Sequence, residues 1–114
     1  MKKKFSIVIP VLNENENLLI LVKMIRKNLK NLNYEIIFVD DGSEDGSDKI
    51  LYLLSKKYKN IKFIIRKDKE KDLSQSCYEG IKKSVNDIIL IMDGDMQHHP
   101  KNIRKMLKEY YKDK

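Results

Sequence analysis

Cysteine and long apolar runs are scarce in this chain of 114 residues, and their scarcity excludes several classes of protein. The single cysteine, Cys77, excludes an intramolecular disulfide framework and is typical of a reducing cytosol. No apolar stretch approaches the length of a membrane span. The basic start leads into a short apolar segment broken by Pro10, which predicts a first strand and not a signal peptide. The sequence also lacks zinc-finger spacing and aromatic-interleaved RNA motifs, so we expect no nucleic-acid partner.

Positive charge is the clearest bias of the composition. The formal net charge is +7, and the length suits one domain with one core. This balance fits an anionic membrane surface or phosphorylated substrates, but it also fits a generally lysine-rich surface, because lysines are spread along the whole chain. The best candidate for a membrane-facing patch is the C-terminal stretch, with Lys101, Arg104, Lys105, Lys108, Lys112 and Lys114.

Strand and helix patterns alternate from end to end. Short apolar runs at residues 5–10, 34–39, 61–65 and 88–92 predict strands, and the segments after them place apolar residues at helical spacing. Continuous apolar strands joined by helices are typical of a parallel sheet covered on both faces. We therefore predict an α/β fold with a doubly wound, mostly parallel sheet of about four strands and four helices.

The last two helices have predicted packing faces. The helix after the third strand brings together Cys77, Tyr78, Ile81 and Val85, and we expect Cys77 in the core. The final helix begins near Pro100 and carries Ile103, Met106, Leu107, Tyr110 and Tyr111.

Three polar clusters follow predicted strands, at residues 10–14 (PVLNE), 40–47 (DDGSEDGS) and 93–100 (DGDMQHHP). Loop polarity alone does not require acids at the end of strand after strand. In doubly wound sheets, ligands bind beyond the carboxyl ends of the strands, near the point where strand order reverses. The clusters therefore predict a functional site at that edge.

The third cluster has the alternation of a metal site. Asp93, Asp95 and Gln97 are two residues apart, and such side chains of an extended segment point the same way. Two carboxylates and an amide oxygen suit Mg²⁺ or Mn²⁺, which would bridge the phosphates of a nucleotide. Gly94 would let another backbone or a diphosphate approach closely. A solvated turn explains the same residues equally well.

The other two clusters have both functional and structural interpretations. A carboxylate at Asp40 or Asp41 could accept hydrogen bonds from a base or ribose, and two adjacent acids repel unless one has a partner. Asn13 and Glu14 are explained equally well as helix caps. We interpret Ser43 and Ser47 as helix caps, Gly42 and Gly46 as turn residues, and His98 and His99 as surface residues.

Together the segments FSIVIPVLNENENL, YEIIFVDDGSEDGS and IILIMDGDMQHHPKNI resemble the family 2 glycosyltransferases of the GT-A type. The family pattern is P-x-x-N-E, then V-D-D-G-S-x-D-G, then M-D-x-D-x-Q-H-x-P, and the resemblance runs from Phe5 to about Ile103. The Q-H-x-P ending is closest to the dolichol-phosphate and polyprenyl-phosphate mannosyltransferases.

The resemblance implies a metal-dependent, inverting transfer of a hexose, mannose being favoured, from a nucleotide sugar to a polyprenyl or dolichyl phosphate. GDP-mannose is the favoured donor and UDP-glucose the second. The acceptor phosphate is already anionic, so catalysis would rest on positioning and electrostatics. A lipid acceptor implies a cytoplasmic protein working at the cytoplasmic face of a membrane, attached through its basic surface.

The resemblance also implies roles for single residues. Asp93, Asp95 and Gln97 would hold the metal on the donor diphosphate, with Asp93 and Asp95 as the catalytic residues. Asp41 would contact the base or ribose, supported by Asp40. The full set of residues implied to bind the nucleotide sugar is Pro10, Asn13, Glu14, Asp40, Asp41, Arg66, Ser74 and Asp93.

This chain departs from the family pattern in three ways. Gly94 stands where alanine is usual, and the segment 72–74 (DLS) stands where relatives often carry Gly-Leu-Gly or Gly-Leu-Ser, which alters the loop over the donor. Family members also continue well past residue 114, so we expect 1–114 to be a single glycosyltransferase domain cut short on its acceptor side. The alternative is a catalytically incomplete nucleotide-binding fragment or assembly module that needs a partner chain. A phosphoacceptor receiver domain has a similar rhythm but needs its acids after the first and third strands.

Overall fold

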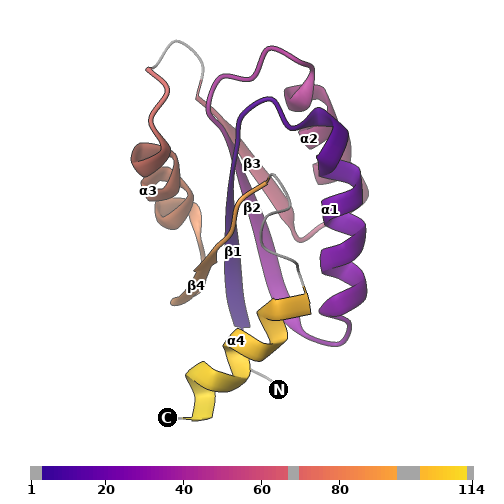
Figure 1. Cartoon of the computed structure of the whole chain (residues 1–114), viewed down its shortest axis with the longest axis vertical. Helices are drawn as coiled ribbons and strands as arrows, with labels where there is room; N and C mark the ends of the chain where they lie inside the picture. The colour runs from indigo at the N-terminus through magenta and orange to yellow at the C-terminus, as the bar shows by residue number, and fades with distance from the viewer. Residues whose placement is uncertain (1–3, 67–69, 95–100, 113–114) are drawn as a thin grey trace.

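The computed structural model describes residues 4–66, 70–94 and 101–112. One four-stranded sheet runs through the molecule, with helices on both faces (Figure 1). The strands are β1 (Lys4–Val11), β2 (Asn33–Asp40), β3 (Ile61–Ile65) and β4 (Ile88–Ile91), and the helices are α1 (Asn15–Asn28), α2 (Ser47–Lys57), α3 (Leu73–Lys83) and α4 (Lys101–Lys112). The predicted alternation of four strands with four helices is confirmed.

All neighbouring strands are parallel, in the order β3-β2-β1-β4. The chain first adds β2 and β3 on one side of β1 and then returns to place β4 on its other side, which is the predicted doubly wound arrangement. The strand order therefore reverses between β1 and β4. β4 pairs with β1 only as far as Val8, opposite Ile91, so β1 extends beyond β4 toward the carboxyl edge.

Pro10 lies inside the central strand β1, which ends one residue later than the sequence predicts. Proline is rare in central strands because it removes a ladder donor. Here Met92 donates its N–H to the carbonyl of Val8 at 3.1 Å, so this edge of β1 faces β4. In this register the next ladder bond would run from residue 10 of β1 to the carbonyl of Met92, and Pro10 has no N–H to donate, which fits the end of the β4 pairing at Ile91.

The larger core lies between the sheet and the helices α1, α2 and α4. Alternate residues of the central strands point to this side, and the helices contribute apolar residues at helical spacing. The core residues are Phe5, Ile7, Ile9, Val11, Leu18, Leu21, Val22, Ile25, Leu29, Ile36, Phe38, Leu51, Leu54, Ile61, Met92, Ile103 and Leu107.

The opposite face of the sheet is covered by α3, which packs over β1 and β2 (Figure 1). Its buried residues are Ser76 and Gly80, which are small. The helix approaches so closely that a Cβ on Gly80 would lie 2.4 Å from Cγ1 of Val8 and 3.1 Å from Cγ2 of Val39. Larger side chains therefore cannot form the buried face of this helix.

The prediction that Cys77 lies in the core is wrong, and the apolar residues grouped with it do not form the buried face of α3. Tyr78, Ile81 and Val85 are exposed, with 53%, 39% and 76% of their surface accessible. Cys77 is only half-buried, and burial together with the charge of Asp93 raises the pKa of its thiol. The sequence places apolar residues at helical spacing on one face of α3. The helix nevertheless turns its other face, with Ser76 and Gly80, to the sheet, because only small residues fit at such a close approach.

The basic helix α4 lies at the amino edge of the sheet. Arg104 donates from Nε to the carbonyl of Asn28 and from Nη2 to that of Lys30, both at 2.7 Å, so α4 is held at the C-terminal end of α1 (Figure 1). Met106 and Tyr110 of this helix are exposed, whereas Ile103 and Leu107 are buried. None of the helices in the described part of the chain is long and apolar enough to cross a membrane.

Candidate functional site

A cleft of about 340 Å³ opens at the carboxyl edge of the sheet, beside the reversal of strand order. Four segments far apart in the sequence form it: the end of β1 with its loop, the residue after β2, the entry into α3, and the residues after β4. The cleft is lined by Pro10, Val11, Leu12, Glu14, Asp41, Lys71, Asp72, Leu73, Ser76, Asp93 and Gly94.

Four residues singled out from the sequence, Pro10, Glu14, Asp41 and Asp93, line this cleft together. Each predicted polar cluster contributes at least one of them. The predicted metal ligands Asp95 and Gln97, like His98 and His99, lie outside the described residues. Within the described residues, no group of three His, Cys, Asp or Glu side chains is placed to hold a metal ion.

Asp41 is nearly buried at the base of the cleft, with 6% of its surface accessible. Its Oδ1 is paired with Nη1 of Arg66, and its Oδ2 accepts the N–H of Asp72 at 2.7 Å. The backbone N–H of Asp41 donates to the carbonyl of Val11 at 2.9 Å. The charge of this acid is therefore balanced by an arginine, and its carboxylate keeps lone pairs beyond those that the two donors use.

Arg66 lies behind the cleft wall and is 4% exposed. Its Nε contacts Oε2 of Glu79 at 2.5 Å, and its Nη1 lies 3.4 Å from the carbonyl of Glu70 and from Oγ of Ser76. Burial alone would lower the pKa of the Arg66 guanidinium, but Glu79 and Asp41 raise it above its usual value. Arg66 is absent from the cleft lining, and Glu79, its acidic partner on α3, was not anticipated from the sequence.

Asp40 shapes the turn after β2. Its side chain is buried, and Oδ1 accepts the N–H groups of Gly42 at 3.2 Å and Ser43 at 2.8 Å. Gly42 has a φ of 98°, a conformation that favours glycine, as the turn interpretation expects. Oδ2 of Asp40 has no hydrogen-bond partner among the described residues. The geometry gives Asp40 a role in holding the loop that follows Asp41.

The loops after β1 and β2 are bonded to each other. Asn13 donates its N–H to Oγ of Ser43 and accepts the N–H of Glu44 at its Oδ1, both at 2.8 Å. The N–H of Glu14 donates to Oγ of Ser47 at 3.2 Å. Asn13 thus fastens the two loops and is not part of the cleft lining.

The prediction that Ser43 and Ser47 are helix caps is wrong. The N-cap of α2 is Gly46, with a φ of 90°, and the first N–H of the helix, that of Ser47, donates to Oδ1 of Asp45 at 3.0 Å. The hydroxyls of Ser43 and Ser47 instead accept backbone N–H groups from the first loop, some thirty residues earlier in the chain. Asp45 therefore supplies the local bond that the sequence suggested for the serines.

The entry into α3 explains one departure from the family pattern. Asp72 is the N-cap of this helix, and its Oδ1 accepts the N–H of Gln75 at 3.1 Å. Its backbone is extended, with a φ of −154°, so this position does not need glycine. Ser74 is exposed in the first turn and is absent from the cleft lining, whereas its neighbours Leu73 and Ser76 line it.

Gly94 packs against the end of β1. A Cβ built there would lie 3.3 Å from the carbonyl oxygen of Pro10, 3.5 Å from Cγ2 of Ile9 and 3.6 Å from Cγ2 of Val11. The expected close approach of another backbone is therefore present. An alanine would be tight here but would need only a small adjustment.

The cleft is predominantly acidic. Glu14, Asp41, Asp72 and Asp93 line it, and Lys71 is the basic residue among the described lining residues. Lys71 reaches over the turn after Asp41: its Nζ would lie 3.7 Å from a Cβ on Gly42. No pattern singles out Lys71 in the sequence, because it lies in a run of alternating charges.

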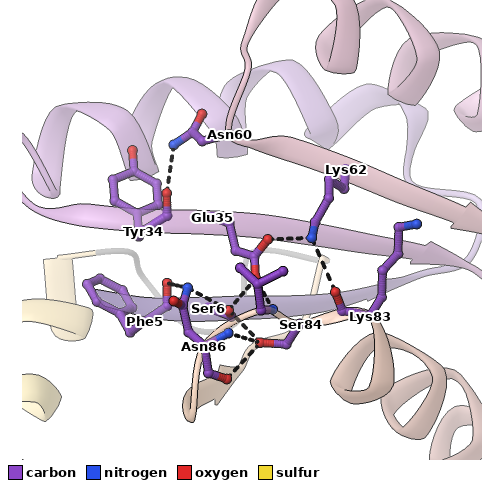
Figure 2. Close-up of polar contacts among 10 residues, drawn as sticks. Phe5, Ser6, Tyr34, Glu35, Asn60, Lys62, Lys83, Ser84 and Asn86 are labelled. Carbon is purple, nitrogen blue, oxygen red and sulfur yellow. Dashed lines mark hydrogen bonds and ion pairs between the residues drawn. The ribbon is translucent and has the colours of Figure 1, made fainter. Parts of the chain in front are cut away.

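A second polar network lies at the amino edge of the sheet, away from the cleft. Glu35 of β2 accepts the hydroxyl of Ser6 at 2.6 Å and the N–H of Val85 at 2.8 Å, and pairs with Nζ of Lys62 at 2.6 Å (Figure 2). Burial alone would raise the pKa of Glu35, but these hydrogen bonds and the charge of Lys62 lower it overall. The network ties the C-terminal end of α3 to the sheet.

Solved structures share this fold. The mannosyltransferase PcManGT from Pyrobaculum calidifontis, solved with GDP-Man and Mn²⁺, superposes with a TM-score of 0.72 at 14% identity, over 83% of this chain and 28% of that one. S. aureus TarS 1–349, solved with UDP-GlcNAc, superposes with a TM-score of 0.75 at 20% identity, over 99% of this chain and 32% of that one. The fold is that of the GT-A glycosyltransferases.

Sequence comparison then gives the family. The model of glycosyl transferase family 2 matches residues 6–114, and the chain belongs to this family, as the motifs predicted. It is 43% identical over 104 residues to the dolichol-phosphate mannosyltransferase of Pyrococcus furiosus, which covers 91% of this chain and 29% of the relative. It is 33% identical over 108 residues to the undecaprenyl-phosphate 4-deoxy-4-formamido-L-arabinose transferase of Photorhabdus laumondii, covering 93% and 33%. The chain spans about a third of the length of these two relatives.

Proposed function

We propose that the cleft at the carboxyl edge binds the nucleotide sugar of a hexosyltransferase whose acceptor is a polyprenyl or dolichyl phosphate. The observation that carries this proposal is the meeting of Pro10, Glu14, Asp41 and Asp93 in one cleft at the reversal of strand order. GDP-mannose is the favoured donor, since the Pyrococcus relative is a dolichol-phosphate mannosyltransferase. A UDP-sugar is the second choice, since the TarS structure holds UDP-GlcNAc.

Two groups in the cleft suit different parts of such a donor. The remaining lone pairs of the Asp41 carboxylate can accept N–H groups of a base or hydroxyl groups of ribose. Lys71, which lies over the neighbouring turn, can contact a phosphate as a mobile positive charge. The hydrogen bonds that fix the loops around Asp41 keep this surface in one arrangement before the donor arrives.

A divalent cation belongs to this proposal. Four acidic residues line the cleft, so a bare diphosphate would be repelled, and the carboxylate of Asp93 is a suitable ligand for Mg²⁺ or Mn²⁺. Asp93 would hold the cation together with Asp95 and Gln97. When bound, the metal would neutralise the charge that develops on the leaving diphosphate. PcManGT, which shares the fold, was solved with Mn²⁺.

The transfer itself would be an inverting displacement in which a phosphate oxygen of the acceptor attacks the anomeric carbon of the sugar. The nucleophile is already anionic, so positioning and charge stabilisation carry the reaction. The lipid acceptor implies work at a membrane surface. The basic helix α4 lies at the opposite edge of the sheet from the cleft, so the contact with the membrane would come from other residues.

Nucleotide-dependent stabilisation tests the donor site. We expect GDP or UDP to raise the unfolding free energy only with Mn²⁺ present, by about 2.7 kcal/mol at a hundredfold excess over Kd. Asp93→Asn and Asp95→Ala should abolish this shift. Asp87→Asn is the matched control, because Asp87 precedes β4 at the amino edge whereas Asp93 follows it. If the folded parent shows no shift with any nucleotide, or an equal shift in EDTA, the proposed site or its metal is wrong.

Transfer itself is tested separately from donor binding. Labelled mannose from GDP-mannose is offered to this chain together with a polyprenyl phosphate. Turnover would support the whole proposed reaction, whereas donor binding without turnover would limit the proposal to the donor site.

A further inference from the structure

We propose that the ion pair of the buried Arg66 with the half-buried Glu79 is a positioning element that joins Asp41 to the α3 wall of the cleft and so sets the affinity for the donor. The inference rests on the proposed function, because it concerns the same cleft. Neither residue lines the cleft. Both act through other groups, and they are therefore positioning and not catalytic residues.

The guanidinium of Arg66 connects three segments of the chain. It pairs with Asp41 after β2 through Nη1 and with Glu79 on α3 through Nε, the second contact at 2.5 Å. Nη1 also lies 3.4 Å from the carbonyl of Glu70, on the segment that enters α3, and 3.4 Å from Oγ of Ser76 in the first turn of this helix. The backbone N–H of Arg66 donates to the carbonyl of Asp40 at 2.8 Å, so its main chain is fixed to β2 as well.

These contacts close a ring of interactions around the cleft wall. Asp41 Oδ2 accepts the N–H of Asp72 at 2.7 Å, and Asp72 is the N-cap of the helix that carries Glu79. The ring thus runs from Asp41 through Arg66 and Glu79 along α3 to Asp72 and back to Asp41. Lys71 and Leu73, which flank Asp72 and line the cleft, are held in place by this ring.

The chemistry of arginine suits this role. A guanidinium is planar and presents donors in fixed directions, so one side chain can orient two carboxylates at once. The side chain of Arg66 is 3% exposed and that of Glu79 15%, so water does not compete freely for these bonds. Removing the charge of Glu79 would leave the Arg66 guanidinium with its pair to Asp41 and the two long contacts to Glu70 and Ser76. With its Nε less firmly held, the guanidinium could turn, and the orientation of the Asp41 carboxylate would change with it.

The variants Glu79→Gln and Arg66→Lys test this proposal, with Glu35→Gln as the matched control. Glu35 is a buried carboxylate that also holds α3 to the sheet, but it lies at the amino edge, away from the cleft. We expect Kd for GDP or UDP with Mn²⁺, measured by calorimetry well below the unfolding midpoint, to rise on the order of tenfold in Glu79→Gln, because the ion pair becomes a weaker hydrogen bond from Arg66 to a neutral amide. Arg66→Lys should weaken binding at least as much, since an ammonium cannot reproduce the fork. Glu35→Gln should lower the unfolding midpoint and leave Kd unchanged.

Unchanged Kd in Glu79→Gln, or equal weakening in Glu35→Gln, would overturn the proposal, because either result means a purely structural role. A parent that binds no nucleotide would refute the donor site instead. In that case the positioning ring is tested by hydrogen exchange of the Asp72 amide, which donates to Asp41. Its protection should fall in Glu79→Gln and stay in Glu35→Gln, and equal protection in both variants would refute the ring.

Discussion

Replacing Gly80 with alanine tests how closely α3 packs on the sheet. In a helix this exchange ordinarily stabilises by about 1 kcal/mol, because alanine is the better helix former. Here the new Cβ would lie 2.4 Å from Cγ1 of Val8 and 3.1 Å from Cγ2 of Val39, and both valines are fully buried. Overpacking costs about 1–3 kcal/mol, and such a short contact belongs at the upper end. We therefore expect Gly80→Ala to lower the unfolding free energy by about 1–2 kcal/mol.

Urea unfolding followed by circular dichroism measures this loss, and a double-mutant cycle identifies its cause. Val8→Ala removes both carbons of Val8 that the new methyl group meets, so Gly80→Ala should cost less in that background than alone. The coupling should favour the double variant by about 1 kcal/mol. A rise in stability for Gly80→Ala, or strictly additive losses in the cycle, would show that α3 can move away from the sheet at little cost and would refute the close-packing argument.

Two further predictions concern the amino edge and the open strand. The pKa of Glu35 is lowered in the folded protein, so its carboxylate stabilises the fold above the unfolded pKa of about 4.3, and this contribution is lost as the pH falls through the folded value. Glu35→Gln should lower the unfolding free energy at pH 7 by about 1–3 kcal/mol and should make the unfolding free energy fall less steeply as the pH drops below about 4.3. Urea titrations at a series of pH values measure this, and an equally steep fall in the variant and the parent would contradict it. β4 is an edge of the described sheet with an unbroken apolar sequence, and Ile91 is 46% exposed there. Exposed apolar edge strands can pair with another copy of the chain. Ile91→Lys should therefore reduce self-association measured by light scattering, while changing the unfolding free energy by less than about 0.5 kcal/mol. Equal association of both proteins would exclude this edge as the contact.

The strands and the place of the cleft could be predicted because both depend on chain order and periodicity. Each strand of a parallel sheet buried on both faces is a continuous apolar run, and such runs stand out in the sequence. Parallel strands bring their carboxyl ends to one edge, so residues that follow different strands must meet. Pro10, Asp41 and Asp93, drawn from three separate clusters, therefore line one cleft.

The partners of the side chains could not be predicted in the same way. Arg66 bonds to Asp41 across 25 positions and to Glu79 across 13. The family resemblance singled out this arginine, but no pattern in the sequence indicated either partner. Ser43 binds the N–H of Asn13 across 30 positions, whereas capping rules consider only neighbours. These choices depend on how loops approach one another in space.

The packing of α3 connects stability with the geometry of the cleft. Near its C-terminal end, Glu35 accepts the N–H of Val85 at the amino edge of the sheet. Toward the cleft, Glu79 and Asp41 share Arg66, and between these two attachments Gly80 lies directly on β1. A side chain at position 80 would push the helix away from the sheet and so strain one or both attachments. We therefore expect loss of the amino-edge attachment to lower stability alone, because it contacts no cleft residue, whereas loss of the other attachment should also release the cleft wall. Glu35, which is buried, and Glu79, which is half-buried, hold the same helix and should have separable effects, one on folding and one on binding.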